Sequence, residues 1–435
     1  MILYDIAYCL AALLGAPVWL WKPKARRKVY YALAGDIPRR SGNEVGIMIH
    51  AVSVGEINAT RELIRRLRAE RSADPVHFIV TTTTDTGLAR GQSLYADQAD
   101  VTVVRFPLDF SWAVGRLFKN LRPKLVVLME LEVWPNFLIQ CRRGGVPVIV
   151  INGRMTTASF SRYRMVRPLV GVMFQKLKRI CAQDETYARR FIELGADATA
   201  VSVTGTMKFD TADVTEPSAL ARDLVAALRL AADKADPIWV CGSTGPGEEQ
   251  IVLEEYRQLL ERFPKLRLML VPRHPERFDE VAGLISSAGF ACVRRSQSAI
   301  VTSNSSIPFK VPPVTLIDTM GELRACYSLA DVVFVGRTLV DLGPRQHGSD
   351  MIEPAALAKP VIVGPFTGNF AEPMEKFAAA GAMKIVADHK ELGRQVAELL
   401  SDPAKADELG RRARQVVLNE QGATVRHVKV ILELL

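Results

Sequence analysis

The sequence predicts an α/β protein made of two doubly wound domains that face each other across a cleft, preceded by a membrane anchor. The chain has 435 residues, more than one ordinary domain needs. Short apolar runs rich in β-branched residues alternate with helical stretches, the pattern of parallel strands joined by crossover helices. The polar, turn-rich segment 210–217 interrupts this alternation once. We therefore expect one sheet on each side of it, with ligands between their carboxyl edges.

Residues 1–21 form an apolar stretch about as long as a helix that crosses a bilayer. Asp5 and Pro17 interrupt it, and its tyrosines and tryptophans are residue types that favour the headgroup region. No cation precedes the stretch, which argues against a cleaved signal peptide. We expect 1–40 to be an uncleaved anchor with a basic flank, either spanning once or embedded in one leaflet. The flank then lies on the cytoplasmic side, with the body of the protein.

The first domain is expected over 41–210. Its strands are predicted at 45–52, 76–82, 101–105, 124–129, 146–151, 179–183 and 200–204. Its helices are predicted at 57–71, 85–95, 110–120, 134–143, 160–178 and 185–195.

The second domain is expected over 211–415, followed by a C-terminal helix over 416–435. Its strands are predicted at 237–242, 266–271, 289–293, 313–317, 331–335, 360–363 and 383–386. Its helices are predicted at 218–232, 247–262, 275–287, 320–329, 351–358, 371–380 and 389–401.

Charge is distributed unevenly along the chain. The formal net charge is +9, and the stretch 133–183 contains nine cations and no acidic residue. Local basic surfaces favour an anionic partner, either nucleic acid or an anionic lipid surface. Within that stretch, 160–178 mixes large apolar side chains with cations, and Pro168 should kink or split the helix. Such a helix can lie in a membrane interface, although it can equally pack on a core with a solvated basic face.

The composition excludes several classes of protein. The six cysteines and six histidines are scattered without metal-ligand spacing, so we expect no metal site. No G-x-G-x-x-G follows a strand and no G-x-S-x-G is present, which argues against a dinucleotide oxidoreductase and a serine hydrolase. The basic residues accompany the apolar anchor and no known nucleic-acid module, so we expect no nucleic-acid partner.

His50-Ala-Val-Ser-Val-Gly-Glu56 joins a strand to a helix and carries one carboxylate to the helix start. In an open α/β sheet that corner binds ligands. Ser53 and Glu56 also have the spacing of a capping box, in which the two residues satisfy each other's backbone amides. We treat these roles as alternatives for one side chain and expect Glu56 to point into the cleft.

Other strand ends carry polar groups as well. Glu130 and Glu132 follow the fourth strand, and Lys208 follows the seventh, where an ammonium group can meet developing negative charge. In the second domain, the turn 242–249 opens a helix and offers amides to a phosphate, although it lacks the lysine of a P-loop. Three further turns stand at helix starts or strand ends there, and Asp350 has capping-box spacing to Glu353. Together they indicate a nucleotide held by amides, Arg273 and a ribose-binding glutamate.

As a set, these motifs resemble the bacterial 3-deoxy-D-manno-octulosonic acid (Kdo) transferases of lipopolysaccharide synthesis, in order and over nearly the whole chain. They are His50-Ala-Val-Ser-Val-Gly-Glu56, Glu130-Leu-Glu132-Val-Trp-Pro-Asn136, Asn152-Gly-Arg154, Gly205-Thr-Met-Lys208-Phe-Asp210, Val271-Pro-Arg-His-Pro-Glu-Arg-Phe278, Asp318-Thr-Met-Gly-Glu-Leu323 and Glu353-Pro-Ala-Ala356.

The resemblance implies a GT-B fold and an inverting transfer of Kdo from CMP-Kdo to the 6′-hydroxyl of a lipid A precursor, lipid IVA. It implies that this occurs at the cytoplasmic face of the inner membrane, without a metal or cofactor. It assigns Glu56 as general base, and Glu130 and Lys208 as groups that stabilise the transition state. It places the CMP contacts at Pro272, Arg273, Met320, Gly321, Glu322, Asp350, Met351, Ile352 and Glu353.

The chain departs from the family pattern at two places. The turn 242–249 lacks the His-Glu that usually precedes Gly-Glu-Glu, and the segment 336–353 is longer than usual, with Asp350 where an asparagine is common. Two alternatives stay open on the sequence alone: a GT-B transferase or epimerase acting on another nucleotide sugar, and a membrane-docked binding protein with a vestigial cleft.

Overall fold

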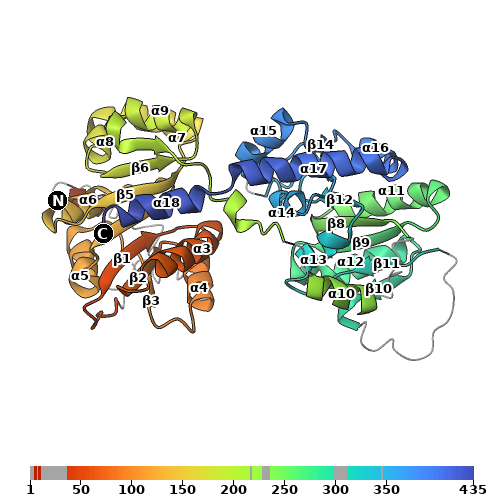
Figure 1. Ribbon diagram of the computed structural model, residues 1–435, viewed down its shortest axis with the longest axis horizontal. Helices are drawn as coiled ribbons and strands as arrows, with labels where there is room; N and C mark the ends of the chain where they lie inside the picture. The colour runs from red at the N-terminus through yellow and green to blue at the C-terminus, as the bar shows by residue number, and fades with distance from the viewer. Residues whose placement is uncertain are drawn as a thin grey trace. The chain divides into compact units, whose positions relative to one another are not determined.

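The computed structural model describes residues 4–6, 8–10, 37–215, 218–227, 236–297, 311–343 and 346–435. The chain divides into two compact units, which comprise residues 1–211 with 421–435 and residues 212–420. Each unit is an α/β domain with helices on both faces of a parallel sheet (Figure 1). The expected C-terminal helix from 416 is in fact two helices, α17 (Pro403–Glu420) in unit 2 and α18 (Ala423–Leu432) in unit 1.

Within the described ranges, unit 1 contains a seven-stranded parallel sheet in the order β3-β2-β1-β4-β5-β6-β7. The strands are β1 (Val45–His50), β2 (Val76–Thr82), β3 (Val101–Arg105), β4 (Leu125–Met129), β5 (Val148–Gly153), β6 (Arg179–Ala182) and β7 (Val201–Val203). The remaining helices are α3 (Val54–Glu70), α4 (Asp85–Leu94), α5 (Ser111–Leu121), α6 (Pro135–Arg143), α7 (Thr157–Met165), α8 (Arg167–Phe174) and α9 (Glu185–Glu193).

Unit 2 likewise has a seven-stranded parallel sheet in its described part, in the order β10-β11-β9-β8-β12-β13-β14. The strands are β8 (Ile238–Thr244), β9 (Arg267–Pro272), β10 (Cys292–Arg294), β11 (Val314–Leu316), β12 (Val332–Val335), β13 (Val361–Val363) and β14 (Lys384–Ile385). Its other helices are α10 (Ser218–Ala227), α11 (Glu248–Arg262), α12 (Phe278–Ser287), α13 (Leu323–Leu329), α14 (Ile352–Ala356), α15 (Ala371–Ala379) and α16 (His389–Ser401).

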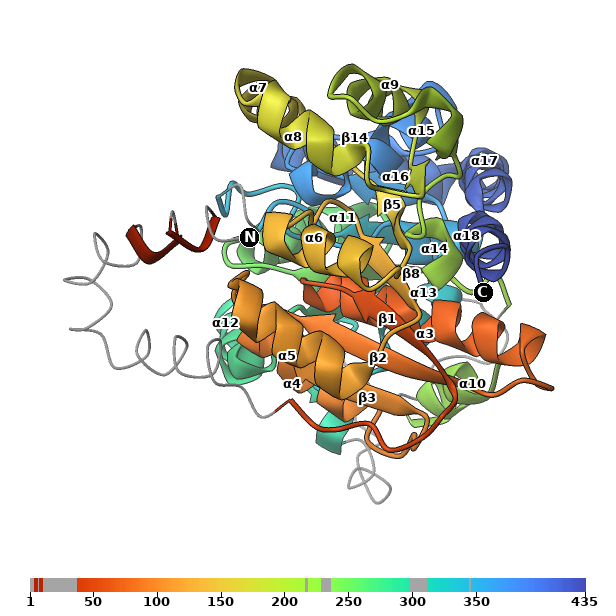
Figure 2. The same cartoon turned by 90° about the vertical axis from the view of Figure 1, so that its left-hand side faces the viewer.

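Alternation of side chains along the central strands explains why helices cover both faces of the first sheet. In β1, Met48 belongs to one apolar cluster, whereas Ile47 and Ile49 belong to the other. Successive strand residues point to opposite faces, so a strand that is apolar throughout must be buried twice. Figure 2 shows α5 and α6 on one face and α3 with α18 on the other.

The strand order places a topological switch point in each sheet, between β1 and β4 in unit 1 and between β8 and β12 in unit 2. Ligands of open α/β sheets bind outside the carboxyl ends of the strands at such points. Among the described residues, four of the six non-glycine residues with positive φ lie at the ends of these strands or of the neighbouring β5: Glu130 (57°), Asn152 (52°), Ser243 (55°) and Arg337 (59°). Backbone strain of this kind persists where the surroundings impose it, often at functional sites.

All fourteen predicted strands are confirmed, with ends that differ by a few residues. The predicted helix 160–178 is split at Val166 into α7 and α8, with Pro168 in the first turn of α8, as its rigid ring requires. The predicted anchor 1–21 lies largely outside the described residues. Among the residues that are described, no helix combines the length and the apolar character that a membrane span requires.

Candidate active site

Glu56 occupies the first turn of α3, and its carboxylate does two things at once. Ser53 caps the helix and accepts from the Glu56 amide, while Glu56 Oε2 accepts from the Val52 amide at 3.0 Å and Oε1 from the Ser53 amide at 3.1 Å. The side chain nevertheless lines a pocket of about 200 Å³. The expectation that capping and pocket are alternatives is therefore wrong. Each carboxylate oxygen has about two acceptor sites, so one on each remains for a ligand hydroxyl.

The same pocket collects side chains from the ends of three strands. Its lining comprises Glu56, Glu130, Leu131, Glu132, Arg154, Thr156, Ser159 and Tyr163. Burial and the neighbouring Glu56 raise the pKa of Glu130, whereas the cations Arg154 and Lys208 oppose this shift. Burial also raises the pKa of Glu132, which accepts from the Trp134 indole at 3.2 Å. Of the three residues predicted to be catalytic, Glu56 and Lys208 thus both act electrostatically on the third, Glu130.

The loop that carries Lys208 is held by contacts from two other elements. Asn152, in the strained backbone of β5, accepts from the Met207 amide at 3.1 Å through Oδ1. Asp210 accepts from the Gly422 amide at 2.6 Å and from the Thr424 amide, and so caps α18. Fully buried His427 of α18 hydrogen-bonds to Thr204 at 2.8 Å. Helix α18 therefore fixes the position of the loop that carries the Lys208 ammonium group.

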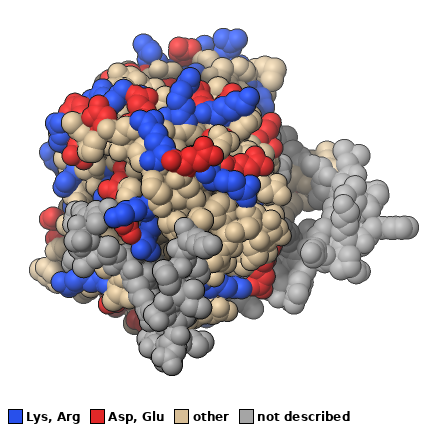
Figure 3. Space-filling view, turned by 90° about the vertical axis from the view of Figure 1, so that its right-hand side faces the viewer, with Lys and Arg blue, Asp and Glu red and all other residues tan. Residues whose placement is uncertain are grey.

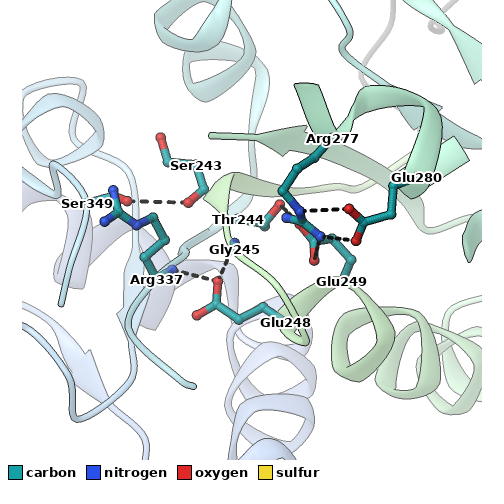
Figure 4. A network of polar contacts seen from close by, with 9 residues as sticks. All are labelled: Ser243, Thr244, Gly245, Glu248, Glu249, Arg277, Glu280, Arg337 and Ser349. Carbon is teal, nitrogen blue, oxygen red and sulfur yellow. Dashed lines mark hydrogen bonds and ion pairs between the residues drawn. The ribbon is translucent and has the colours of Figure 1, made fainter. Parts of the chain in front are cut away.

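In unit 2 the turn 242–249 is organised by a carboxylate instead of free amides (Figure 4). The fully buried Glu248 accepts from four backbone amides, those of Gly245 at 2.9 Å, Arg337 at 2.6 Å, Thr338 at 2.9 Å and Leu339 at 2.9 Å. Of these four amides only that of Gly245 belongs to the turn, so the expectation that the turn offers amides to a phosphate stays a prediction. Glu248 ties the start of α11 to the loop after β12.

A second buried carboxylate stands beside it. Glu249 accepts from Arg277 Nη1 at 2.7 Å and from the Thr244 hydroxyl at 2.8 Å, and Arg277 also pairs with Glu280 (Figure 4). Because both partners of the Glu249–Arg277 pair are buried, the pair holds β8 and α11 to the 275–277 turn as one rigid corner.

Two arginines approach each other at the carboxyl edge of this sheet. Arg273 follows Pro272, the last residue of β9, and is exposed. Burial and the charge of Arg273 both lower the pKa of Arg337, which begins the loop after β12. Two guanidinium groups that repel each other favour an anion between them. Arg273 was predicted as a CMP contact, and Arg337 lies near enough for the charges of the two side chains to interact.

The predicted contacts Met320, Gly321 and Glu322 form the turn before α13. Met320 is 69% exposed, and Gly321 has φ of 87°. Glu322 is buried and accepts from Arg295 Nη2 at 2.9 Å and from the Thr319 hydroxyl. The Glu322 carboxylate thus fixes the turn, while Met320 is the side chain of the three that projects outward.

The segment 350–353 differs from its predicted capping box. Asp350 accepts from the Ile352 amide at 2.8 Å, and the N-cap of α14 is Met351, without a side-chain cap. Met351 and Ile352 are buried as whole residues, so a contact of CMP with these two positions stays a prediction. Burial, with a further contribution from Asp350, raises the pKa of Glu353 to about 7, and Arg324 opposes the shift.

Comparison with known proteins identifies the family. A family model described as 3-deoxy-D-manno-octulosonic-acid transferase matches residues 23–211. The 3-deoxy-D-manno-octulosonic acid transferase of Haemophilus influenzae is 34% identical over 88% of this chain and 85% of its own length. The chain belongs to the Kdo transferase family. The Kdo transferase of Bordetella pertussis is 32% identical, with 94% of each chain covered. The predicted family and the prediction of a glycosyltransferase are thereby confirmed.

A solved glycosyltransferase from Rickettsia africae matches the Kdo transferase chain in fold. Its TM-score is 0.57 over 90% of this chain and 99% of the solved one, at 15% identity. The predicted resemblance to GT-B glycosyltransferases, with two parallel-sheet domains, is confirmed at the level of the fold.

Sequence reasoning assigned no role to two cations that lie beside predicted site residues, Arg154 and Arg337. Arg154 lines the Glu56 pocket and acts on Glu130, and Arg337 faces Arg273. Each follows the carboxyl end of a central strand, after Gly153 of β5 and Gly336 beyond β12. A cation directly after the glycine that ends such a strand is the signal that could have found both.

Proposed function

We propose that the protein moves Kdo from CMP-Kdo to the 6′-hydroxyl of lipid IVA, with inversion and release of CMP, and that Glu56 is the general base. The observation that carries the proposal is the grouping of Glu56, Glu130, Arg154 and Lys208 at one sheet edge. Glu56 would take the acceptor hydroxyl's proton as that oxygen bonds to the sugar. Glu130 and Lys208 would stabilise the charges that develop on sugar and phosphate as the bond to CMP breaks.

Unit 2 is proposed to bind the donor. Arg273 and Arg337 supply positive charge for the phosphate, and the half-buried Glu353 supplies a carboxylate for the ribose hydroxyls. Gly321, which has no side chain and a φ of 87°, offers close approach for the remainder of the nucleotide. A site with two arginines for a phosphate and a carboxylate for a ribose fits a nucleotide sugar as the donor.

Mass spectrometry of the products tests the proposal. Purified protein is incubated with lipid IVA and either CMP-Kdo, CMP alone or UDP-sugars. We expect lipid IVA to gain Kdo and free CMP to appear only with CMP-Kdo. Turnover of a UDP-sugar without use of CMP-Kdo would instead indicate another transferase or an epimerase. Tight binding of anionic lipid without any product would indicate a binding protein.

We also propose that unit 1 docks on the cytoplasmic face of an anionic inner membrane through α7 and α8. Met165, Val166, Leu169 and Val172 expose between 45% and 78% of their surface, and the acid-free stretch 133–183 supplies the surrounding cations. The face of the molecule in Figure 3, by contrast, carries both signs interspersed. Exposed apolar side chains beside cations are what a lipid interface with anionic headgroups recognises.

Charge reversal of Arg162, Arg164 and Arg167 should weaken binding to vesicles containing anionic lipid by at least about a hundredfold, at roughly 1 kcal/mol per cation. Cosedimentation with vesicles measures this. The control reverses three exposed cations of unit 2, Lys390, Arg394 and Arg411, and should leave binding nearly unchanged. Equal binding by the two triple variants would contradict membrane docking through α7 and α8.

The raised pKa of Glu353 predicts pH-dependent nucleoside binding. The ionised carboxylate accepts ribose hydroxyls best, and its pKa is about 7, so affinity should fall as pH drops through that value. We expect cytidine to bind about tenfold more weakly at pH 6 than at pH 8, as one linked proton requires. Cytidine is a better probe than CMP because it has no phosphate group that titrates between pH 6 and pH 8. Calorimetry of Glu353→Gln should show weak binding with no such dependence; an unchanged pH profile would contradict the role.

A further inference from the structure

The described N-terminal residues, 4–6 and 8–10, are helical and lie against unit 1 through polar contacts. Asp5 Oδ1 accepts from the Ser111 amide at 2.8 Å and from Asn136 Nδ2 at 2.9 Å, and Oδ2 accepts from the Ser111 hydroxyl at 2.5 Å. One carboxylate thus joins the start of the chain to the starts of α5 and α6.

Asp5 supplies what α5 lacks. The N-cap of α5 is Phe110, whose side chain cannot accept a hydrogen bond, so the first amides of the helix have no local partner. The Asp5 carboxylate accepts from the Ser111 amide and places an anion at the positive end of the helix dipole. A buried carboxylate without partners is unfavourable in an apolar stretch. The hydrogen bonds that Asp5 accepts from the protein offset this cost.

Tyr8 extends the contact by one helical turn. Its hydroxyl donates to Asp109 Oδ2 at 3.1 Å, and its ring meets Phe110 edge-on at 5.8 Å. Asp109 accepts in turn from the Asn136 amide at 2.9 Å and the Phe137 amide at 2.8 Å, and so caps α6, whose N-cap Trp134 provides no cap. Both helix starts are therefore held by groups that contact the N-terminal segment.

The start of α6 is also the end of the loop that carries the pocket carboxylates. Glu130 and Glu132 lie four and two residues before Trp134, and the Asn136 side chain donates to Asp5 and to the Asp109 carbonyl. Meanwhile Ile6 and Leu10, four residues apart, expose 52% and 56% of their surface. The segment thus turns Asp5 and Tyr8 to the protein and leaves an apolar side outward.

We propose that Asp5 is a positioning residue that docks the N-terminal segment onto unit 1 and holds the loop 130–134 in its pocket conformation. Attachment of the N-terminal segment to the membrane is then coupled to the shape of the acceptor pocket. The coupling to catalysis rests on the proposed function of Glu56 and Glu130, whereas the docking contact itself does not.

The test uses the full chain with Asp5→Ala, Asn136→Ala, the double variant and Cys9→Ser as control, since Cys9 is exposed in the same N-terminal segment. Transfer to detergent-dispersed lipid IVA measures kcat and KM, cosedimentation measures vesicle binding, and hydrogen exchange measures protection of residues 109–137. We expect Asp5→Ala to lower kcat about tenfold or more through misplacement of the loop. Vesicle binding should change less than twofold, and Cys9→Ser should behave as the parent.

The double variant tests whether Asp5 acts through its contact with Asn136 or only through an effect on membrane attachment. If Asp5 acts through Asn136, the double variant should lose little more activity than either single one, because contacting residues are not additive. Additive losses in kcat would overturn the proposal, as would unchanged exchange at Ser111 and Asn136 in Asp5→Ala. Faster exchange there without loss of kcat would overturn the coupling to catalysis. Failure of the proposed function appears separately, as normal turnover by Glu56→Gln.

Discussion

Replacing Glu56 by Gln should lower kcat for Kdo transfer by about 10²–10⁴-fold, the usual contribution of a general base. The pocket side of the carboxylate has an acceptor site on each oxygen after the Val52 and Ser53 amides are bound. A glutamine amide keeps the volume but cannot take a proton, and its NH₂ group faces one of the two backbone amides, so one capping hydrogen bond is lost as well. Single-turnover rates with CMP-Kdo and lipid IVA measure the effect, and KM for both substrates should change little.

Ser53→Ala is the matched control for the structural role of Glu56. It removes the hydroxyl that accepts from the Glu56 amide at 3.2 Å but leaves both amides that bind the carboxylate. Loss of an N-cap side chain costs about 1 kcal/mol. We therefore expect Ser53→Ala to melt earlier and retain kcat within a few fold, whereas Glu56→Gln loses kcat in a folded protein. Near-normal turnover of Glu56→Gln would exclude Glu56 as the general base.

Much of the fold could be predicted because parallel strands that are buried on both faces appear in the sequence as uninterrupted apolar runs. β4 reads Leu-Val-Val-Leu-Met and is buried at every position, so only a strand covered on both faces explains it. The carboxyl ends of parallel strands share one edge, so Glu56, Glu130 and Lys208 could be expected there from the sequence, and Glu56 and Lys208 both act on Glu130 in the structure.

What could not be predicted lies in hydrogen bonds between distant segments. Spacing shows that Ser53 and Glu56 can cap a helix, but not which acceptor sites of the carboxylate stay free. Asp5 interrupts an apolar stretch, and its hydrogen-bond partners Ser111 and Asn136 lie 106 and 131 residues away along the chain. Arg337 was overlooked since its place depends on a strained backbone and on Glu248, which no local pattern reveals.

Glu248→Ala should lower the free energy of unfolding of unit 2 by about 3–5 kcal/mol, the largest effect on stability that we expect. Four backbone amides would lose their acceptor in a site without exposure, at roughly 1 kcal/mol or more for each buried group left unpaired. Glu248→Gln should be destabilising too, because its NH₂ group would face amide donors that need an acceptor.

The matched control is Glu254→Ala, on the exposed side of the same helix α11, which should change stability by less than about 0.5 kcal/mol. Denaturant unfolding followed through Trp239, fully buried in β8, reports on unit 2. The loop after β12 depends on Glu248 for its shape, so Glu248→Ala should also weaken CMP binding at temperatures where unit 2 remains folded. Equal stability of the two alanine variants would show that water or other groups satisfy the four amides as well as the carboxylate does.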